Sequence, residues 1–218
     1  MDGFALPQDM PVHDPDDPAS PPPLPFGPRD WPRDMDEAAF IAFTAARPEK
    51  ERWELWDGEP RLMNPGSFRH QRVAARLSTR LDDHFLDRSM PFVCAPEVGI
   101  RFAGYDDFLA VADLAVLHQE DAAKEYPGNY VDRFVLAAEI VSPSNTMGEI
   151  ATKVARYREH AECLYVLTLA QDEPSLTVSA RDKGWAERRI EGAGAMLDLP
   201  TFGFEVALSD IYSRIIGH

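Results

Sequence analysis

Residues 109–117 read Leu-Ala-Val-Ala-Asp-Leu-Ala-Val-Leu, and residues 134–141 read Phe-Val-Leu-Ala-Ala-Glu-Ile-Val. Each run is apolar at almost every position, which is typical of strands covered on both faces of a sheet. Each run also holds one acid, Asp113 or Glu139, and the residues two positions away on either side are apolar. A carboxylate in such surroundings is costly unless it is paired or bound to a metal. The two runs therefore predict both the centre of the fold and the place of its chemistry.

The spacing of apolar residues predicts further helices and strands around these two runs. Asp34 followed by Glu37 predicts a capping box at the start of the first helix, and Asp57-Gly58 predicts a tight hairpin turn. The order of elements predicts an α/β (α+β) fold, with helices packed against a sheet in one domain. The expected helices are about 36–45, 68–87 and 147–160; the expected strands are 53–56, 60–63, 92–102, 109–117, 133–141, 163–169, 176–180 and 185–190, and an amphipathic segment at 204–216 closes the chain.

Residues 1–33 differ in composition from the rest of the chain. They are rich in Pro and Asp and show almost no hydrophobic periodicity. Such a segment cannot bury enough apolar area to offset the entropy lost on ordering, so we expect a disordered N-terminal tail. We interpret it as a solvated leader, in preference to an arm that binds a partner. The folded domain is expected to span residues 34–218.

The charge and composition exclude several classes of protein. The chain has 218 residues and a net charge of −15, which argues against a wide basic surface for duplex DNA but allows a small acidic site that holds a cation. It has no run of 18 apolar residues and no basic start followed by an apolar stretch, so neither a membrane span nor a secretory signal is expected. The two cysteines, Cys94 and Cys163, form no C-x-x-C pair. A cytoplasmic protein without disulfides or a thiolate zinc site is expected.

If the two central strands are neighbours, Asp113 and Glu139 converge. Two carboxylates at close range repel unless a cation neutralises them, and hard oxygen ligands suit magnesium or manganese. The alternative is a pair of structural acids that cap loops or bind an arginine. Glu54, His70 and Lys153 each have an ordinary explanation when taken alone, as a half-exposed strand acid, a histidine at a helix start and a solvated helix lysine.

Arginines recur along the helix expected at 68–87. Arg72, Arg76 and Arg80 are spaced by four and form one stripe, which Arg69 and Arg61 could extend. The stripe could bind phosphates, but a solvated helix face explains it slightly better, because three arginines supply only a modest electrostatic attraction. The sequence contains no helix-turn-helix or zinc-finger signature, so it predicts no sequence-specific readout.

An Asp on one strand, a Glu on the next and a Lys nearby resemble the PD-(D/E)xK phosphodiesterase superfamily. Over about residues 36–210 the chain is similar to the bacterial putative restriction endonuclease family of the Uma-two type. The residues that carry this resemblance are Arg52 to Glu59, Met63 to Pro65, His70, Ala112-Asp113, Glu139 to Thr146, Lys153 and Tyr157.

The resemblance implies a restriction-endonuclease-like mixed central sheet flanked by helices. It also implies a site of Glu54, Asp113 and Glu139 as metal ligands, with Mg²⁺ as the cofactor and Mn²⁺ as its alternative. The superfamily's Pro before the Asp is Ala112 here, and its lysine two residues after the Glu is Val141. The resemblance therefore implies that Lys153 takes the place of that lysine.

The resemblance implies a metal-dependent endonuclease that hydrolyses phosphodiester bonds of DNA. Lys153 would position the attacking water, and His70 would contact the phosphate or assist the acids. A homodimer is compatible with this activity, because cutting two strands needs two sites; no protein partner is identifiable. The alternative is a catalytically inactive protein of the same fold that acts as a binding or regulatory module. A serine hydrolase has little support, since Ser142 and Ser144 lie outside any G-x-S-x-G turn.

Overall fold

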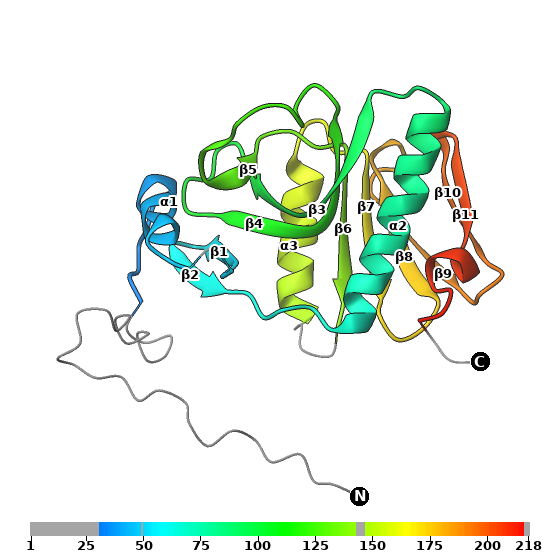
Figure 1. Cartoon of the computed structure of the whole chain (residues 1–218), viewed down its shortest axis with the longest axis horizontal. Coiled ribbons are helices and arrows are strands. Elements are labelled where there is room, and N and C mark those ends of the chain that lie inside the picture. The colour runs from blue at the N-terminus through cyan, green and yellow to red at the C-terminus, as the bar shows by residue number, and fades with distance from the viewer. Residues whose placement is uncertain (1–30, 49, 143–146, 216–218) are drawn as a thin grey trace, which may run out of the picture. The chain divides into compact units, whose positions relative to one another are not determined.

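The computed structural model describes residues 31–48, 50–142 and 147–215, and in this part of the chain the main feature is a nine-stranded mixed sheet (Figure 1). The strand order is β2-β1-β4-β6-β7-β8-β9; β3 also pairs with β4, and β5 pairs with β3. The β6/β7 and β3/β5 pairs are parallel and the others are antiparallel. The strands are β1 (Trp53–Trp56), β2 (Glu59–Leu62), β3 (Phe92–Arg101), β4 (Leu109–His118), β5 (Tyr130–Val131), β6 (Leu136–Val141), β7 (Tyr165–Ala170), β8 (Ser175–Ala180) and β9 (Glu187–Glu191).

The two apolar runs form adjacent strands at the centre of this sheet. β4 and β6 pair antiparallel through Leu114↔Ala138 and Val116↔Leu136. Nearly every residue of both strands is buried. The prediction that they are neighbours, on which the convergence of the two acids depends, is confirmed.

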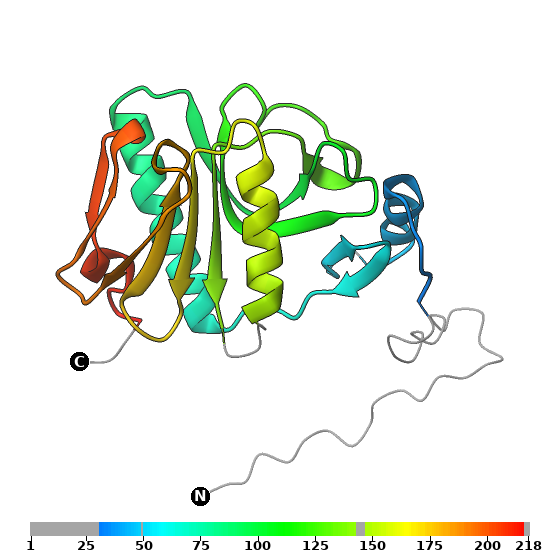
Figure 2. The same ribbon diagram turned by 180° about the vertical axis from the view of Figure 1, so that it is seen from behind.

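Two long helices cover opposite faces of the sheet. The helices are α1 (Glu37–Ala45), α2 (Phe68–Asp87), α3 (Met147–Glu159) and the short α4 (Leu208–Ile211), with 3-10 turns at Pro127–Asn129, Arg181–Lys183 and Pro200–Phe202. α2 lies on the face seen in Figure 1, and α3 lies on the face seen in Figure 2. α2 buries Val73, Leu77, Leu81 and Phe85, spaced by four as the sequence predicts. α3 follows β6 and leads into the parallel strand β7, so it is the crossover of a βαβ unit.

Two local predictions differ in outcome. Asp57 and Gly58 have φ angles of 51° and 76°, as a type I′ hairpin turn requires, so the predicted β1–β2 hairpin is confirmed.

The predicted capping box is wrong. The N-cap of α1 is Asp36, whose side chain accepts a hydrogen bond from the Ala39 N–H at 2.8 Å. Glu37 instead binds Arg101 on β3.

The end of the chain is more structured than its sequence predicts. β10 (Met196–Leu199) and β11 (Phe204–Ala207) form a separate hairpin, and α4 follows it directly. The segment expected to be one amphipathic element is therefore a strand followed by a short helix. Leu197, Phe204 and Leu208 from this region join the core beside α2.

Two predictions concern residues that the structure does not describe. Residues 1–30 of the expected tail and residues 143–146 of the loop after β6 lie outside the described ranges. Among the helices of the described part, none combines the length and the apolar character needed to cross a membrane.

Candidate active site

The five predicted site residues all line one cavity of about 890 Å³. They come from five different elements: Glu54 from β1, His70 from α2, Asp113 from β4, Glu139 from β6 and Lys153 from α3. Clefts of this size that gather titratable groups are the usual place of ligand binding and catalysis. The sequence prediction thus identified groups that the fold brings together, although their roles remain predictions.

Asp113 lies where the side-chain alternation of β4 changes. Ala110 and Ala112 before it, and Ala115 and Leu117 after it, all pack in the core beneath α3, so the alternation shifts by one residue at Asp113. In a regular strand, residues separated by an odd number of positions face opposite sides. The shift occurs where the β3–β4 ladder omits one pair, between Pro96↔Leu114 and Val98↔Ala112.

The Asp113 carboxylate is held from two sides. Its Oδ2 accepts a hydrogen bond from the Ile140 N–H at 2.7 Å, and its Oδ1 lies 3.1 Å from His70 Nε2. The first contact ties it to the residue after Glu139 on the neighbouring strand. The side chain is 13% exposed, so it is only partly buried and can be reached from the cavity.

Lys153 binds both of the other acids. Its Nζ lies 2.9 Å from Glu139 Oε2 and 3.0 Å from Glu54 Oε1, and it donates to the carbonyl of Val111 at 2.7 Å. The side chain is 7% exposed, because Lys153 belongs to the buried face of α3 with Ile150 and Tyr157. Burial alone would lower the pKa of the Lys153 ammonium, but the negative charges of Glu139, Glu54 and Asp113 outweigh this effect and raise that pKa, which favours the charged form. The explanation as a solvated helix lysine is excluded.

Glu139 is the most deeply buried of the three acids. Tyr157 donates its hydroxyl to Glu139 Oε1 at 2.6 Å, and Lys153 binds Oε2. Burial raises the pKa of Glu139 to about 8 against the attraction of Lys153, and the negative charge of Asp113 contributes to the rise. This carboxyl group therefore takes up a proton more readily than an ordinary glutamate.

Glu54 links the edge hairpin to the centre of the sheet. Its Oε1 accepts the Val111 N–H at 2.8 Å, and its Oε2 accepts the indole N–H of Trp56 at 3.0 Å. Glu54 is 7% exposed. With Lys153, these contacts give each oxygen of the carboxylate a defined partner and fix its position.

The N-terminus of α2 positions His70. The Ser67 hydroxyl accepts the His70 backbone N–H at 3.2 Å and donates to Gln171 Oε1 at 2.8 Å, which joins α2 to the end of β7. A Cβ at Gly66 would lie 2.8 Å from the His70 ring, so glycine leaves the space that the ring occupies. Burial lowers the pKa of His70, but the hydrogen bond and charge of Asp113, aided by Glu139, outweigh this effect and raise it.

Several residues of this network escaped sequence reasoning. Tyr157 lies one helical turn after Lys153, which places both side chains on one face of α3, but the sequence by itself assigns Tyr157 no role. Gly66 and Ser67 stood in an ordinary loop pattern. Gln171 is 104 residues from Ser67, and no local pattern connects them.

The carboxylates of the cavity are the groups that could bind a divalent cation. Within residues 31–48, 50–142 and 147–215, no group of three or more His, Cys, Asp or Glu side chains is gathered closely enough to hold a metal ion. Lys153 lies between Glu54 and Glu139 and keeps their oxygens occupied. The oxygens of the three carboxyl groups are hard ligands, which match magnesium or manganese. The carboxylates therefore fit a divalent ion in the chemistry of their oxygens, whereas their spacing in the described part of the chain gives the place between Glu54 and Glu139 to Lys153.

The family model named Uma2, described as "Putative restriction endonuclease", matches residues 38–209. The chain belongs to this family. The predicted resemblance is thereby confirmed over nearly the whole described domain. The Uma2 match includes all five predicted site residues, from Glu54 to Lys153.

The Uma2 fold is also found among solved structures. One similar structure, from Anabaena variabilis ATCC 29413, is described as a "putative nuclease belonging to DUF820"; it has 14% sequence identity and a TM-score of 0.67. The match covers 82% of this chain and 98% of that one. At this identity the likeness establishes the fold, which confirms the predicted nuclease-type mixed sheet flanked by helices. No curated protein matches the sequence.

Proposed function

We propose that this chain is a divalent-metal-dependent nuclease that hydrolyses phosphodiester bonds of DNA. Its membership of a family described as restriction endonucleases supports the class of reaction. The observation that carries the proposal is the cluster of three carboxylates and one ammonium in the cavity, with Lys153 Nζ within 3.0 Å of both Glu54 and Glu139. A fold gains nothing in stability from gathering three acids in its interior, so we infer that the cluster serves chemistry.

Asp113, Glu139 and Glu54 are the residues that would hold the metal. When bound, a magnesium or manganese ion supplies a Lewis acid that polarises the phosphate and lowers the pKa of a bound water. The Lys153 ammonium offsets negative charge that develops on the phosphate oxygens. Tyr157 orients Glu139 through its hydroxyl. His70 is near enough to Asp113 to position that carboxylate and to donate a hydrogen bond to a phosphate.

The proposal is tested by the variant D113N, which keeps the shape of the side chain and removes its charge. We expect D113N to abolish magnesium-dependent cleavage of plasmid DNA, and the exposed D182N variant to keep it. Asp182 is a suitable control because its side chain is 56% exposed and pairs only with Lys183 in the described part of the chain. Unchanged cleavage by a clean preparation of D113N would exclude this mechanism.

A second function is supported by one specific observation. Lys153 already neutralises part of the acidic cluster, as it would in a protein that keeps the fold without the reaction and acts as a binding or regulatory module. Titration calorimetry with Mn²⁺ separates the two functions. A nuclease binds the ion and loses this binding in D113N, whereas wild-type protein that binds no ion supports the inactive module.

A further inference from the structure

The cations that line the cavity outside its acidic centre gather on one wall. Lys50, Arg52 and Arg61 come from the β1–β2 hairpin and the segment before it, and all three line the cavity. On the other side α2 and β3 contribute His70, Gln71 and Glu97. We propose that Lys50, Arg52 and Arg61 bind the phosphates of one nucleic acid strand beside the scissile bond. This inference rests on the proposed nuclease function and assigns it a binding surface.

Arg61 is held in place for such a contact. Its guanidinium lies 4.6 Å from the centre of the Trp56 ring, and it is 3.6 Å from Glu149. Both partners of this ion pair are more than 40% exposed, so the pair itself contributes little and can exchange for a phosphate. Stacking on an indole fixes the planar group in advance, which lowers the entropy lost when it binds an oxyanion.

Lys50 and Arg52 flank Glu51 on the same wall. The Glu51 carboxylate accepts the indole N–H of Trp53 at 2.9 Å, which fixes the position of this acid. Lys50 and Arg52 are both exposed. Together with Arg61 they give the hairpin wall three positive charges against the carboxylates of Glu51 and Glu149.

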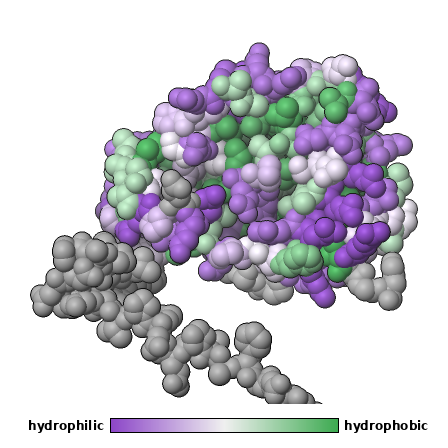
Figure 3. Space-filling view, in the orientation of Figure 1, coloured by the Kyte–Doolittle hydropathy of each residue, from purple (hydrophilic) through white to green (hydrophobic). Residues whose placement is uncertain are grey.

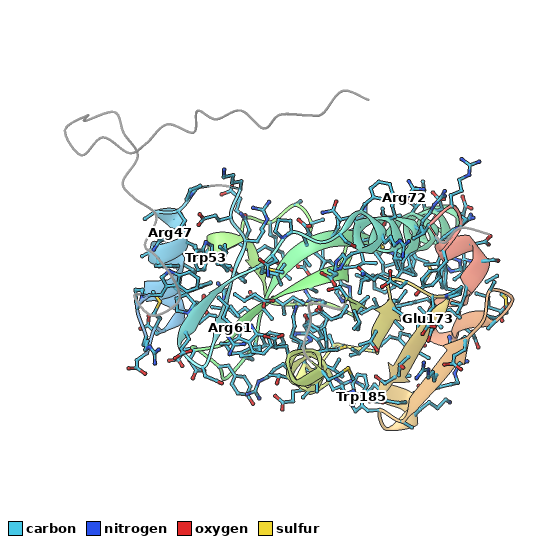
Figure 4. All side chains as sticks on the ribbon, turned by 90° about the horizontal axis from the view of Figure 1, so that it is seen from below. Arg47, Trp53, Arg61, Arg72, Glu173 and Trp185 are labelled. Atoms are coloured by element: carbon cyan, nitrogen blue, oxygen red, sulfur yellow. The ribbon has the colours of Figure 1, made fainter. Side chains whose placement is uncertain are left out.

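The arginine stripe on α2 is the competing phosphate track, and the structure places it elsewhere. None of Arg72, Arg76 and Arg80 lines the described cavity. Arg80 lies 3.7 Å from Asp210 of α4. Figure 4 shows Arg61 beside the hairpin and well apart from Arg72 on α2. The face that carries α2 shows both hydrophilic and hydrophobic residues (Figure 3).

A single basic wall also fits the acidity of the chain. At a net charge of −15 a nucleic acid is repelled by most of the surface, so affinity depends on a few well-placed cations. Three phosphate contacts give a moderate, strongly salt-dependent affinity. Cations on one wall alone engage one backbone, which either a single strand or one strand of a duplex provides.

The test compares two triple variants of equal charge in the cleavage-deficient D113N background. One is K50Q/R52Q/R61Q, and the matched control is R72Q/R76Q/R80Q. Binding of labelled single-stranded and duplex oligonucleotides is measured by fluorescence anisotropy between about 50 and 200 mM salt.

We expect the hairpin variant to lose roughly tenfold or more in affinity at low salt. The slope of log K against log salt should fall by about 2 for a single strand or about 3 for a duplex. The control should lose less than about threefold, as expected when no phosphate contact is removed.

The outcomes separate this inference from the proposed function. Suppose that wild-type protein cleaves DNA. If the hairpin variant then keeps the affinity and salt slope of the D113N parent, or if the α2 variant loses as much affinity as the hairpin variant, this inference is wrong while the proposed nuclease function stands. If wild-type protein does not cleave, the proposed function fails. If the D113N parent binds neither oligonucleotide, the phosphate-binding assignment fails as well. The oligonucleotide that binds more tightly identifies the strand form. Equal melting temperatures of the two variants exclude unfolding as the cause.

Discussion

Lys153 shows how burial changes the role of a residue type that usually faces solvent. Its stem crosses the buried face of α3, and its ammonium meets two carboxylates and a backbone carbonyl. The net stability of such a buried pair is small, because desolvation of the charges offsets their attraction. Removal of one partner is different, since the remaining charges stay buried without compensation.

We therefore expect K153Q to destabilise the protein by about 3–5 kcal/mol and to abolish cleavage. The matched control is K183Q, whose side chain is 69% exposed and pairs with Asp182; it should change the free energy of unfolding by less than about 1 kcal/mol. Urea denaturation measures both variants. Equal stability of K153Q and K183Q would contradict the buried position of the ammonium.

The pKa of Glu139 predicts how stability depends on pH. Its folded-state pKa is raised from 4.5 to about 8, so the folded protein holds this proton more tightly than the unfolded chain. The stability that the proton supplies is complete below about pH 4.5 and is lost as the pH rises to about 8. We expect the melting temperature of the metal-free protein to fall across this range relative to that of E139Q. Mn²⁺ should offset the fall at the upper end, because it binds the deprotonated carboxylate. Parallel pH curves for the two proteins would contradict the raised pKa.

At this scale the sequence predicts the acids better than their partners. Asp113 and Glu139 are conspicuous because each interrupts an apolar run. Only the family resemblance made candidate site residues of Glu54, His70 and Lys153, because the local sequence around each of them is ordinary. Gln171 gave no signal, because its contact with Ser67 exists only after β7 and α2 have packed together.

At the scale of elements, the N-cap of α2 connects helix stability to the site. Ser67 caps the helix and also binds Gln171, so its hydroxyl fixes the start of α2 and with it His70. We expect S67A to lower the free energy of unfolding by about 1 kcal/mol. It should also lower kcat, with a smaller change in KM. The control is D36A, which removes the N-cap of α1 at a similar cost, with no loss of activity. Melting curves and steady-state cleavage distinguish the two. Equal activity losses would show that His70 is insensitive to this cap.

Long periodic elements were predicted well, whereas short ones were predicted only where a turn signal accompanied them, as Asp57-Gly58 does for the four-residue strands β1 and β2. α2, β4 and β6 follow from patterns repeated over six or more residues. β5 has two residues and β10 has four, too few for a period to emerge. These short strands depend on tertiary pairing, as between Gly99 of β3 and Tyr130 of β5, where a Cβ on the glycine would lie 2.5 Å from the tyrosine ring.

At the scale of the whole molecule, the predicted N-terminal tail remains to be tested. Residues 1–30 contain six Asp and one Arg, so they hold a disproportionate share of the net charge. Removal of these residues should leave the melting temperature nearly unchanged and raise the affinity for DNA slightly, because repulsion decreases. Thermal unfolding and anisotropy measure the two effects. A large loss of stability would show that the segment belongs to the folded domain.

The predicted homodimer also belongs to this scale and remains a prediction. Two-strand cleavage by one complex requires two sites, so the protein should sediment as a dimer at the concentrations at which it linearises plasmid in a single event. A monomer that only nicks plasmid would contradict this expectation. Analytical ultracentrifugation and the ratio of nicked to linear product decide between them.

The attachment of the β1–β2 hairpin carries a consequence for how such a protein can change over time. β1 meets β4 through one backbone pair, Leu55↔Leu109, and Glu54 adds a side-chain bond to Val111 two residues further along. A lineage that abandoned the reaction could not discard this acid freely, because the edge of its sheet would loosen. Descendants without activity are therefore expected to retain the acid at position 54, which makes its presence a poor sign that an enzyme is active.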